Sequence, residues 1–64
     1  MKVLLHHPAR ETLLPGPKKV WQVLRELDIL PDTVLVIRRD ELIPEDETVA
    51  DADTIEIRPV ISGG

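Results

Sequence analysis

One short segment of this chain has the apolar spacing of an α-helix, and strand-like segments lie on both sides of it. Four aliphatic residues recur at positions i, i+3, i+4 and i+7, namely Val20, Val23, Leu24 and Leu27. They predict a helix over residues 18–27, with Pro17 suited to its first turn and Pro31 stopping it. Such a short helix has only one apolar stripe to bury, so the rest of the fold must supply a sheet.

The rest of the chain reads as short strands. Apolar and β-branched residues, bounded by proline or charged turns, predict strands over residues 2–7, 11–14, 33–38, 41–43 and 54–58. The expected order is β-β-α-β-β-β, an α+β fold in which one helix crosses a mixed sheet of about five strands. The last strand is buried only if it pairs inside the sheet, beside the first strand. That is the β-grasp arrangement.

Chain length and the absence of cysteine limit how this domain is stabilised and what it can do. Sixty-four residues make one domain near the lower size limit, and no disulfide can support it. A thiolate metal site is excluded, and no side chain can act as a thiol nucleophile or persulfide carrier. Stability must come from the aliphatic core, with the single aromatic residue, Trp21, at its margin.

The charge balance argues against nucleic acid as a direct partner. Eight Lys and Arg against twelve Asp and Glu give a net charge of −4, whereas phosphate binding needs a basic footprint. No apolar run has the length of a membrane span, and the N-terminus lacks a signal-peptide pattern. We therefore expect a cytoplasmic protein that contacts no membrane and is a monomer by itself.

Two groups of residues could in principle bind a metal ion, but their positions in the sequence favour structural roles. His6 and His7 are neighbours in a predicted strand, so their side chains point to opposite faces. The acidic residues between 45 and 53 lack the glycine and the spacing of a calcium loop, which favours a solvated loop. We expect no metal site.

The C-terminal residues are the most distinctive stretch. An apolar strand runs into Pro59 and then, with no linker composition between, into a terminal Gly63-Gly64. A terminal Gly-Gly is often only a frayed end. Here its position predicts a domain over residues 1–59 and a flexible tail over residues 60–64. The free carboxyl group of Gly64 is then the candidate reactive group.

These features together resemble the ThiS/MoaD family of ubiquitin-like sulfur carriers. The resemblance covers nearly the whole chain and is carried by the opening strand and by residues 20–27, 34–42, 49–57 and 59–64. Family members usually have glycine at the positions of Asp28 and Ala52. Because alanine at positive φ costs about 1 kcal/mol, we expect another turn type at residues 51–53.

The resemblance implies a co-substrate rather than an enzyme. A carboxylate is a poor electrophile and has to be activated. In the family, an adenylating enzyme of the ubiquitin-activating type uses ATP to convert the terminal glycine, here Gly64, to an acyl-adenylate. Sulfur from a cysteine desulfurase or a rhodanese-like protein then gives a thiocarboxylate, which a sulfur-accepting synthase consumes. The chain itself would bind no cofactor.

The resemblance implies that these partner enzymes recognise the tail residues. Without Cβ atoms, Gly63 and Gly64 can thread a narrow slot. Ile61 and Ser62 precede them, and Ser62 either orients the backbone by a hydrogen bond or is a small polar linker. When extended, residues 60–64 span roughly 15 Å, enough to enter a buried site.

A partner surface is predicted on the sheet. If Leu35 and Ile37 face the helix, Val34 and Val36 lie on the opposite face, joined by Leu4. The alternative is that the two valines are simply strand formers. Arg58, just before the tail, would either pair with an acidic rim on the partner or offset nearby negative charge.

Three functions remain open from the sequence. The first is a sulfur carrier for the thiamine thiazole, molybdopterin or 2-thiouridine in tRNA. The second is a covalent protein modifier that joins Gly64 to lysines. The third is a non-covalent ubiquitin-like interaction module with an incidental Gly-Gly.

Overall fold

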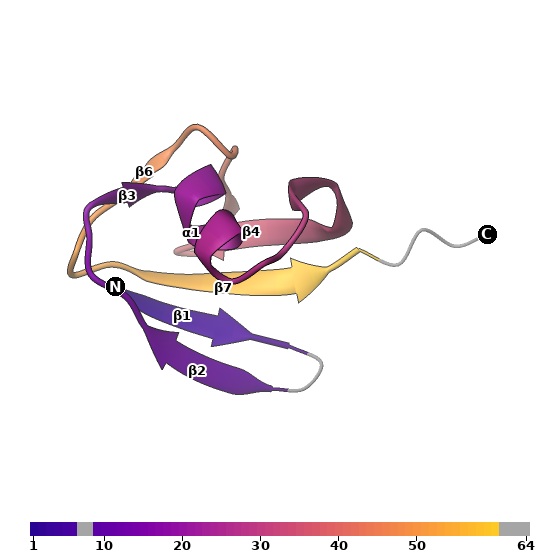
Figure 1. The fold of residues 1–64 in the computed structure, drawn as a ribbon, viewed down its shortest axis with the longest axis horizontal. Coiled ribbons are helices and arrows are strands. Elements are labelled where there is room, and N and C mark those ends of the chain that lie inside the picture. Colours follow the sequence, from indigo (N-terminus) through magenta and orange to yellow (C-terminus); the bar gives the residue numbers. More distant parts are fainter. Residues whose placement is uncertain (7–8, 61–64) are drawn as a thin grey trace.

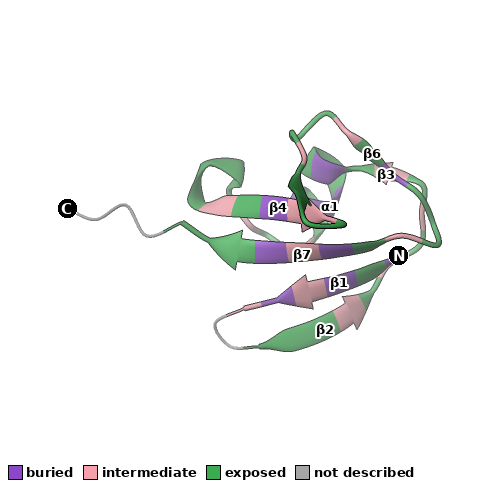
Figure 2. Ribbon diagram, turned by 180° about the vertical axis from the view of Figure 1, so that it is seen from behind, coloured by how far each residue is buried: buried purple, intermediate pink, exposed green. Residues whose placement is uncertain are grey.

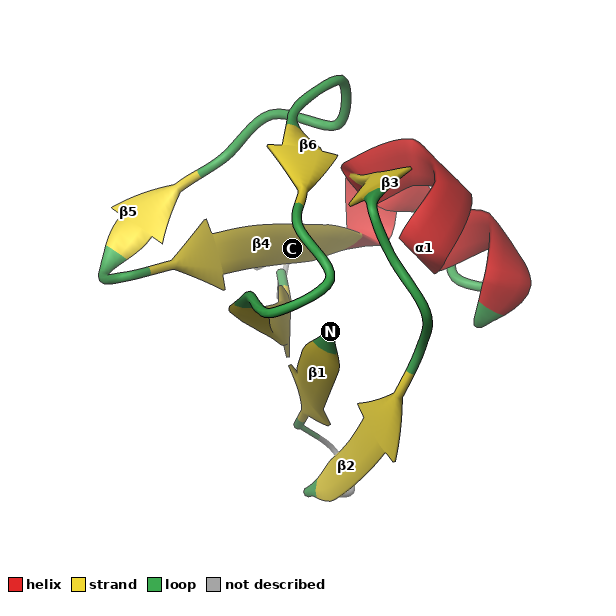
Figure 3. Cartoon of the chain, turned by 90° about the vertical axis from the view of Figure 1, so that its left-hand side faces the viewer, coloured by secondary structure: helices red, strands yellow, loops and turns green. Residues whose placement is uncertain are grey.

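The computed structural model describes residues 1–6 and 9–60, and within them one helix lies across one side of a sheet (Figures 1 and 3). The helix is α1 (Val20–Glu26), and a 3-10 helix, η1 (Pro31–Thr33), follows it. The strands are β1 (Lys2–Leu5), β2 (Arg10–Leu13), β3 (Lys18–Lys19), β4 (Val34–Arg38), β5 (Glu41–Leu42), β6 (Thr48–Val49) and β7 (Thr54–Pro59). Apart from β3 and β6, the predicted order is confirmed, and so is the α+β class.

The five-stranded sheet has the strand order β2-β1-β7-β4-β5. The first and last strands, β1 and β7, are parallel, with Val3 opposite Ile55 and Leu5 opposite Ile57. The other pairs are antiparallel, so the sheet is mixed. The expected burial of the last strand beside the first is confirmed (Figure 1).

The core lies between α1 and the sheet. The helix contributes Val20, Val23 and Leu24, three of the four residues of the predicted stripe; the fourth, Leu27, is partly buried against them. The buried residues are Met1, Val3, Leu5, Val20, Val23, Leu24, Val36, Val49, Ile55 and Ile57. Trp21 is 39% exposed, at the margin of the core as expected.

A second, two-stranded sheet was not predicted. Lys18 pairs with Val49 and Lys19 with Thr48, so α1 begins two residues later than the apolar spacing predicts. Two-residue strands are too short to show alternation. The segment over residues 45–53 is therefore not simply a solvated loop, because Val49 is fully buried.

Two turns contain non-glycine residues with left-handed backbone geometry. Asp28, just past α1, has φ 59°, and the tight β4–β5 turn has positive φ at Arg39 and Asp40. Ala52 is not among the described residues with positive φ, so the turn at 51–53 avoids the strained geometry as expected. Over residues 1–6 and 9–60, no helix is both long and apolar enough to cross a membrane.

Candidate functional site

The tail leaves the domain from the centre of the sheet. Strand β7 lies between β1 and β4 and ends at Pro59. The next residue is anchored, because the Val60 N–H donates a hydrogen bond of 2.9 Å to the Thr33 carbonyl oxygen. The predicted tail residues Ile61, Ser62, Gly63 and Gly64 lie outside the described residues.

The side of the sheet that α1 leaves uncovered, here called the open face, carries a group of apolar side chains. Figure 2 views the sheet from this side and shows buried and more exposed residues alternating along β1 and β7. Leu35 is 44% exposed and Leu42 is 64% exposed. On β1, β4 and β5 the aliphatic residues of the open face are Leu4, Leu35, Ile37 and Leu42, and Leu13 on the edge strand β2 shares this face.

The predicted faces of β4 were reversed. Val36 is buried in the core, and Val34 packs against the core from the same side. Leu35 and Ile37 lie on the open face instead. Leu4 and Arg58 lie on the open face, where the sequence placed them.

The register between β4 and β7 explains the reversal. Val36 is opposite Ile57, a core residue, whereas Ile37 is opposite Glu56 and Leu35 is opposite Arg58. Directly opposite residues share one face of a sheet. Because every residue from 34 to 37 is aliphatic, the sequence of β4 does not show which pair points inward.

Charged groups lie within the open face, near Val60, which is here called the tail root. Glu56 is between Leu4 on β1 and Ile37 on β4, and Arg58 is opposite Leu35. Glu56 Oε2 lies 2.6 Å from His6 Nε2 and accepts a hydrogen bond of 3.2 Å from Arg58 Nη2. The bond from Arg58, followed by the contact with His6, holds the pKa of Glu56 below its usual value. The carboxylate therefore stays charged at neutral pH and joins β7 to His6, the residue that follows β1. His7 lies outside the described residues.

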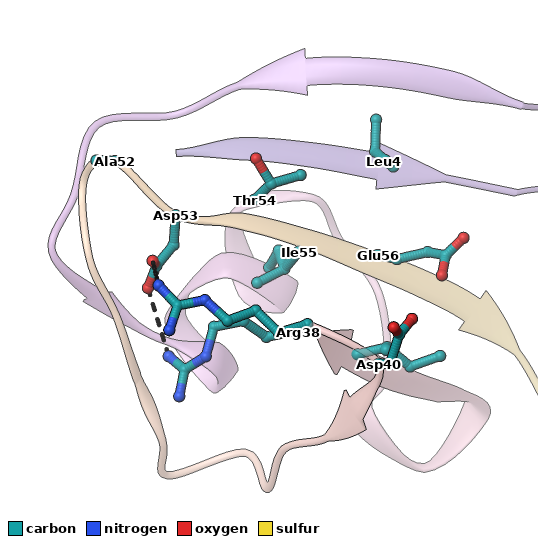
Figure 4. A pocket seen from close by; sticks show the side chains of 10 residues that line it. Leu4, Arg38, Asp40, Ala52, Asp53, Thr54, Ile55 and Glu56 are labelled. Carbon is teal, nitrogen blue, oxygen red and sulfur yellow. Dashed lines mark hydrogen bonds and ion pairs between the residues drawn. The ribbon is translucent and has the colours of Figure 1, made fainter.

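At the far end of the open face lies a hollow of about 450 Å³ (Figure 4). Leu4 and Ile37 form part of its apolar wall, and Arg38 lies at its edge. The Arg38 guanidinium reaches Glu47 at 2.6 Å and Asp53 at 3.4 Å, and so ties β4 to the turns beside β6 and β7. No group of three potential metal ligands occurs among residues 1–6 and 9–60.

Comparison with known proteins places this fold and tail in a family. The family model described as "ThiS family" matches residues 3–64, which include the terminal glycines. The chain belongs to the ThiS family. It is also 38% identical to "Sulfur carrier protein TtuB" of Thermus thermophilus, over 65 aligned positions that cover all of both chains.

Membership of the family accounts for the architecture. ThiS proteins have the β-grasp fold, so the predicted ubiquitin-like arrangement is confirmed. They are small carriers that other enzymes act on, which agrees with the expectation of a carrier rather than an enzyme. Such a carrier requires partner enzymes for activation and for sulfur transfer.

Proposed function

We propose that this protein carries sulfur as a thiocarboxylate on Gly64. A carboxylate oxygen of Gly64 attacks the α-phosphorus of ATP on an adenylating enzyme of the ubiquitin-activating type, and pyrophosphate leaves. A persulfide sulfur from a desulfurase or rhodanese-like donor then attacks the carbonyl carbon, and AMP leaves. A thiol cleaves the resulting S–S bond, so that the terminal thiocarboxylate remains for a sulfur-accepting synthase.

The observation that carries this proposal is the family match through the last residue of the chain. Among side chains, only a cysteine could hold sulfane sulfur, and the chain has none. The anchored Val60 gives the tail a fixed starting point at the edge of the domain. From there, Ile61 and Ser62 would guide Gly63 and Gly64 into the partner's active site.

The open face is the surface we assign to the adenylating enzyme. Its aliphatic residues on β1, β4 and β5, namely Leu4, Leu35, Ile37 and Leu42, lie beside Arg58 and Glu56, and Arg58 lies two residues before the tail root at Val60. Exposed apolar residues grouped on one face support a protein-binding role, and the charged pair among them offers polar contacts to the partner. The valines at 34 and 36 are excluded from this surface by their burial.

The experiment compares two leucine-to-aspartate variants in ATP–pyrophosphate exchange catalysed by the host's adenylating enzyme. Leu35→Asp places a charge on the open face. Leu30→Asp is the matched control, because Leu30 is 71% exposed and lies in the loop between α1 and η1. We expect the KM for Leu35→Asp to rise about tenfold or more, as for loss of a buried interface anchor, while Leu30→Asp resembles the wild type. Equal KM values for both variants contradict the assigned surface.

Experiments in the host organism identify the sulfur-containing product. A deletion strain grown with and without thiamine tests the thiazole, nucleoside analysis tests 2-thiouridine in tRNA, and molybdoenzyme activity tests molybdopterin. The acyl-adenylate could also react with a lysine amine. A glycine remnant on target lysines, together with intact sulfur metabolism in the deletion strain, would favour a protein modifier over a carrier.

A further inference from the structure

A second hollow lies beside the tail root. It measures about 430 Å³ and differs from the one on the open face. Its walls come from β1, the start of β2, the segment that follows α1, and the end of β7. The lining residues are mainly aliphatic, among them Leu5, Ile29, Val34, Ile57 and Val60. We call this the tail-root hollow.

One cation at the rim of this hollow has no partner within the described residues. Arg10 lines the hollow and is exposed, and it forms no ion pair with residues 1–6 or 9–60. By contrast, Lys18, Arg38 and Arg58 each contact a carboxylate. Among the residues that the structure describes, Arg10 therefore leaves a positive charge unpaired beside this hollow, in a chain of net charge −4. It complements a carboxylate on a partner.

The anchored residue Val60 places this hollow at the start of the tail. Val60 both lines the hollow and donates its N–H to Thr33, another lining residue. Any enzyme that grips the residues after Val60 must therefore pass next to the hollow. In β2, Arg10 lies opposite Leu5, a core residue, so Arg10 is on the helix side of the sheet. Arg58 and Glu56 are on the open face.

We propose that the tail-root hollow receives an apolar side chain of the adenylating enzyme, next to a carboxylate that pairs with Arg10. The enzyme then holds the tail root from both sides of the sheet, with the open face on one side and this hollow on the other. The inference rests on the function proposed above, because the partner is the enzyme that activates Gly64.

The test is ATP–pyrophosphate exchange with the full-length chain and the host's adenylating enzyme, comparing Arg10→Glu with Arg25→Glu. Arg25 is also exposed and forms no ion pair with the described residues, but it lies on α1 and does not line the tail-root hollow. Circular dichroism checks that both variants fold. For Arg10→Glu we expect KM to rise about tenfold with little change in kcat, because the ion pair between Arg10 and the enzyme's carboxylate favours encounter and docking. For Arg25→Glu we expect KM within about twofold of wild type.

A conservative variant and the salt dependence sharpen the test. Arg10→Lys keeps the charge and is expected to restore most of the affinity. The KM of the wild type should rise more steeply with NaCl than that of Arg10→Glu, because salt screens the pair. If exchange proceeds and Arg10→Glu has the same KM as Arg25→Glu, the tail-root hollow is not the contact. If the wild type supports no exchange, the proposed function itself fails, and this inference fails with it.

Discussion

At the scale of single residues, Glu56 is the charged group whose role the structure defines most sharply. Its carboxylate contacts His6, the residue that follows β1, and Arg58 from its own strand. The sequence places Glu56 and Arg58 on one face by alternation. It does not predict the contact with His6, because that contact depends on the register between β1 and β7.

The lowered pKa of Glu56 predicts a specific dependence of stability on pH. Because the folded-state pKa lies below the usual value of 4.5, the carboxylate stabilises the fold at pH values above 4.5. This contribution is lost as the pH falls through the lowered pKa. Urea unfolding should show Glu56→Gln to be less stable than wild type at pH 7, with a difference that shrinks as the medium becomes more acidic than pH 4.5.

The control for this prediction is Glu41→Gln. Glu41 is exposed in β5 and forms no ion pair with residues 1–6 or 9–60. Its substitution should leave the pH profile of stability nearly unchanged. A gap between wild type and Glu56→Gln that stays constant with pH, or widens in acid, contradicts the account of Glu56.

At the scale of elements, β4 shows where prediction from the sequence stops. The positions of α1 and of the longer strands follow from apolar spacing and from proline, and the structure agrees to within a few residues. The orientation of β4 does not follow, because residues 34–37 are all aliphatic and only pairing with β7 fixes the buried side. Val34 and Val36 were predicted on the uncovered face for this reason, whereas they lie on the side of the helix.

Alanine substitutions at neighbouring positions of β4 test this orientation. Val36→Ala removes two methyl groups from a core residue that is 5% exposed, and should lower the free energy of unfolding by about 2 kcal/mol. Leu35→Ala removes more atoms, but from a residue that is 44% exposed, and should cost about 0.5 kcal/mol. Denaturant unfolding of both variants measures the difference. A larger loss for Leu35→Ala would restore the original assignment of faces.

The small sheet of β3 and β6 is a second feature that the sequence does not predict. It is held by backbone pairing between two-residue segments and by Val49, which is fully buried in a stretch rich in acidic residues. Residue type alone favours a loop there. Residues 18–19 and 48–49 are far apart in the sequence, so a local sequence pattern cannot reveal that they pair.

At the scale of the whole molecule, the tail root is the point where the candidate surfaces meet. The open face lies on one side of the sheet, and the tail-root hollow opens beside the helix on the other. Val60 is anchored between them. The family, the fold and the candidate reactive residue Gly64 were all accessible from the sequence. The surfaces were not, because they depend on strand register and on packing of the α1–η1 segment.

The central claim is that sulfur is carried on the carboxyl group of Gly64, and the mass of the C-terminal peptide tests it most directly. Protein purified from its host, or incubated with the adenylating enzyme, ATP and a persulfide donor, is digested and analysed by mass spectrometry. We expect exchange of one oxygen for sulfur at Gly64, and none when ATP is omitted. An unmodified Gly64 under both conditions, or sulfur on any other residue, would contradict the claim.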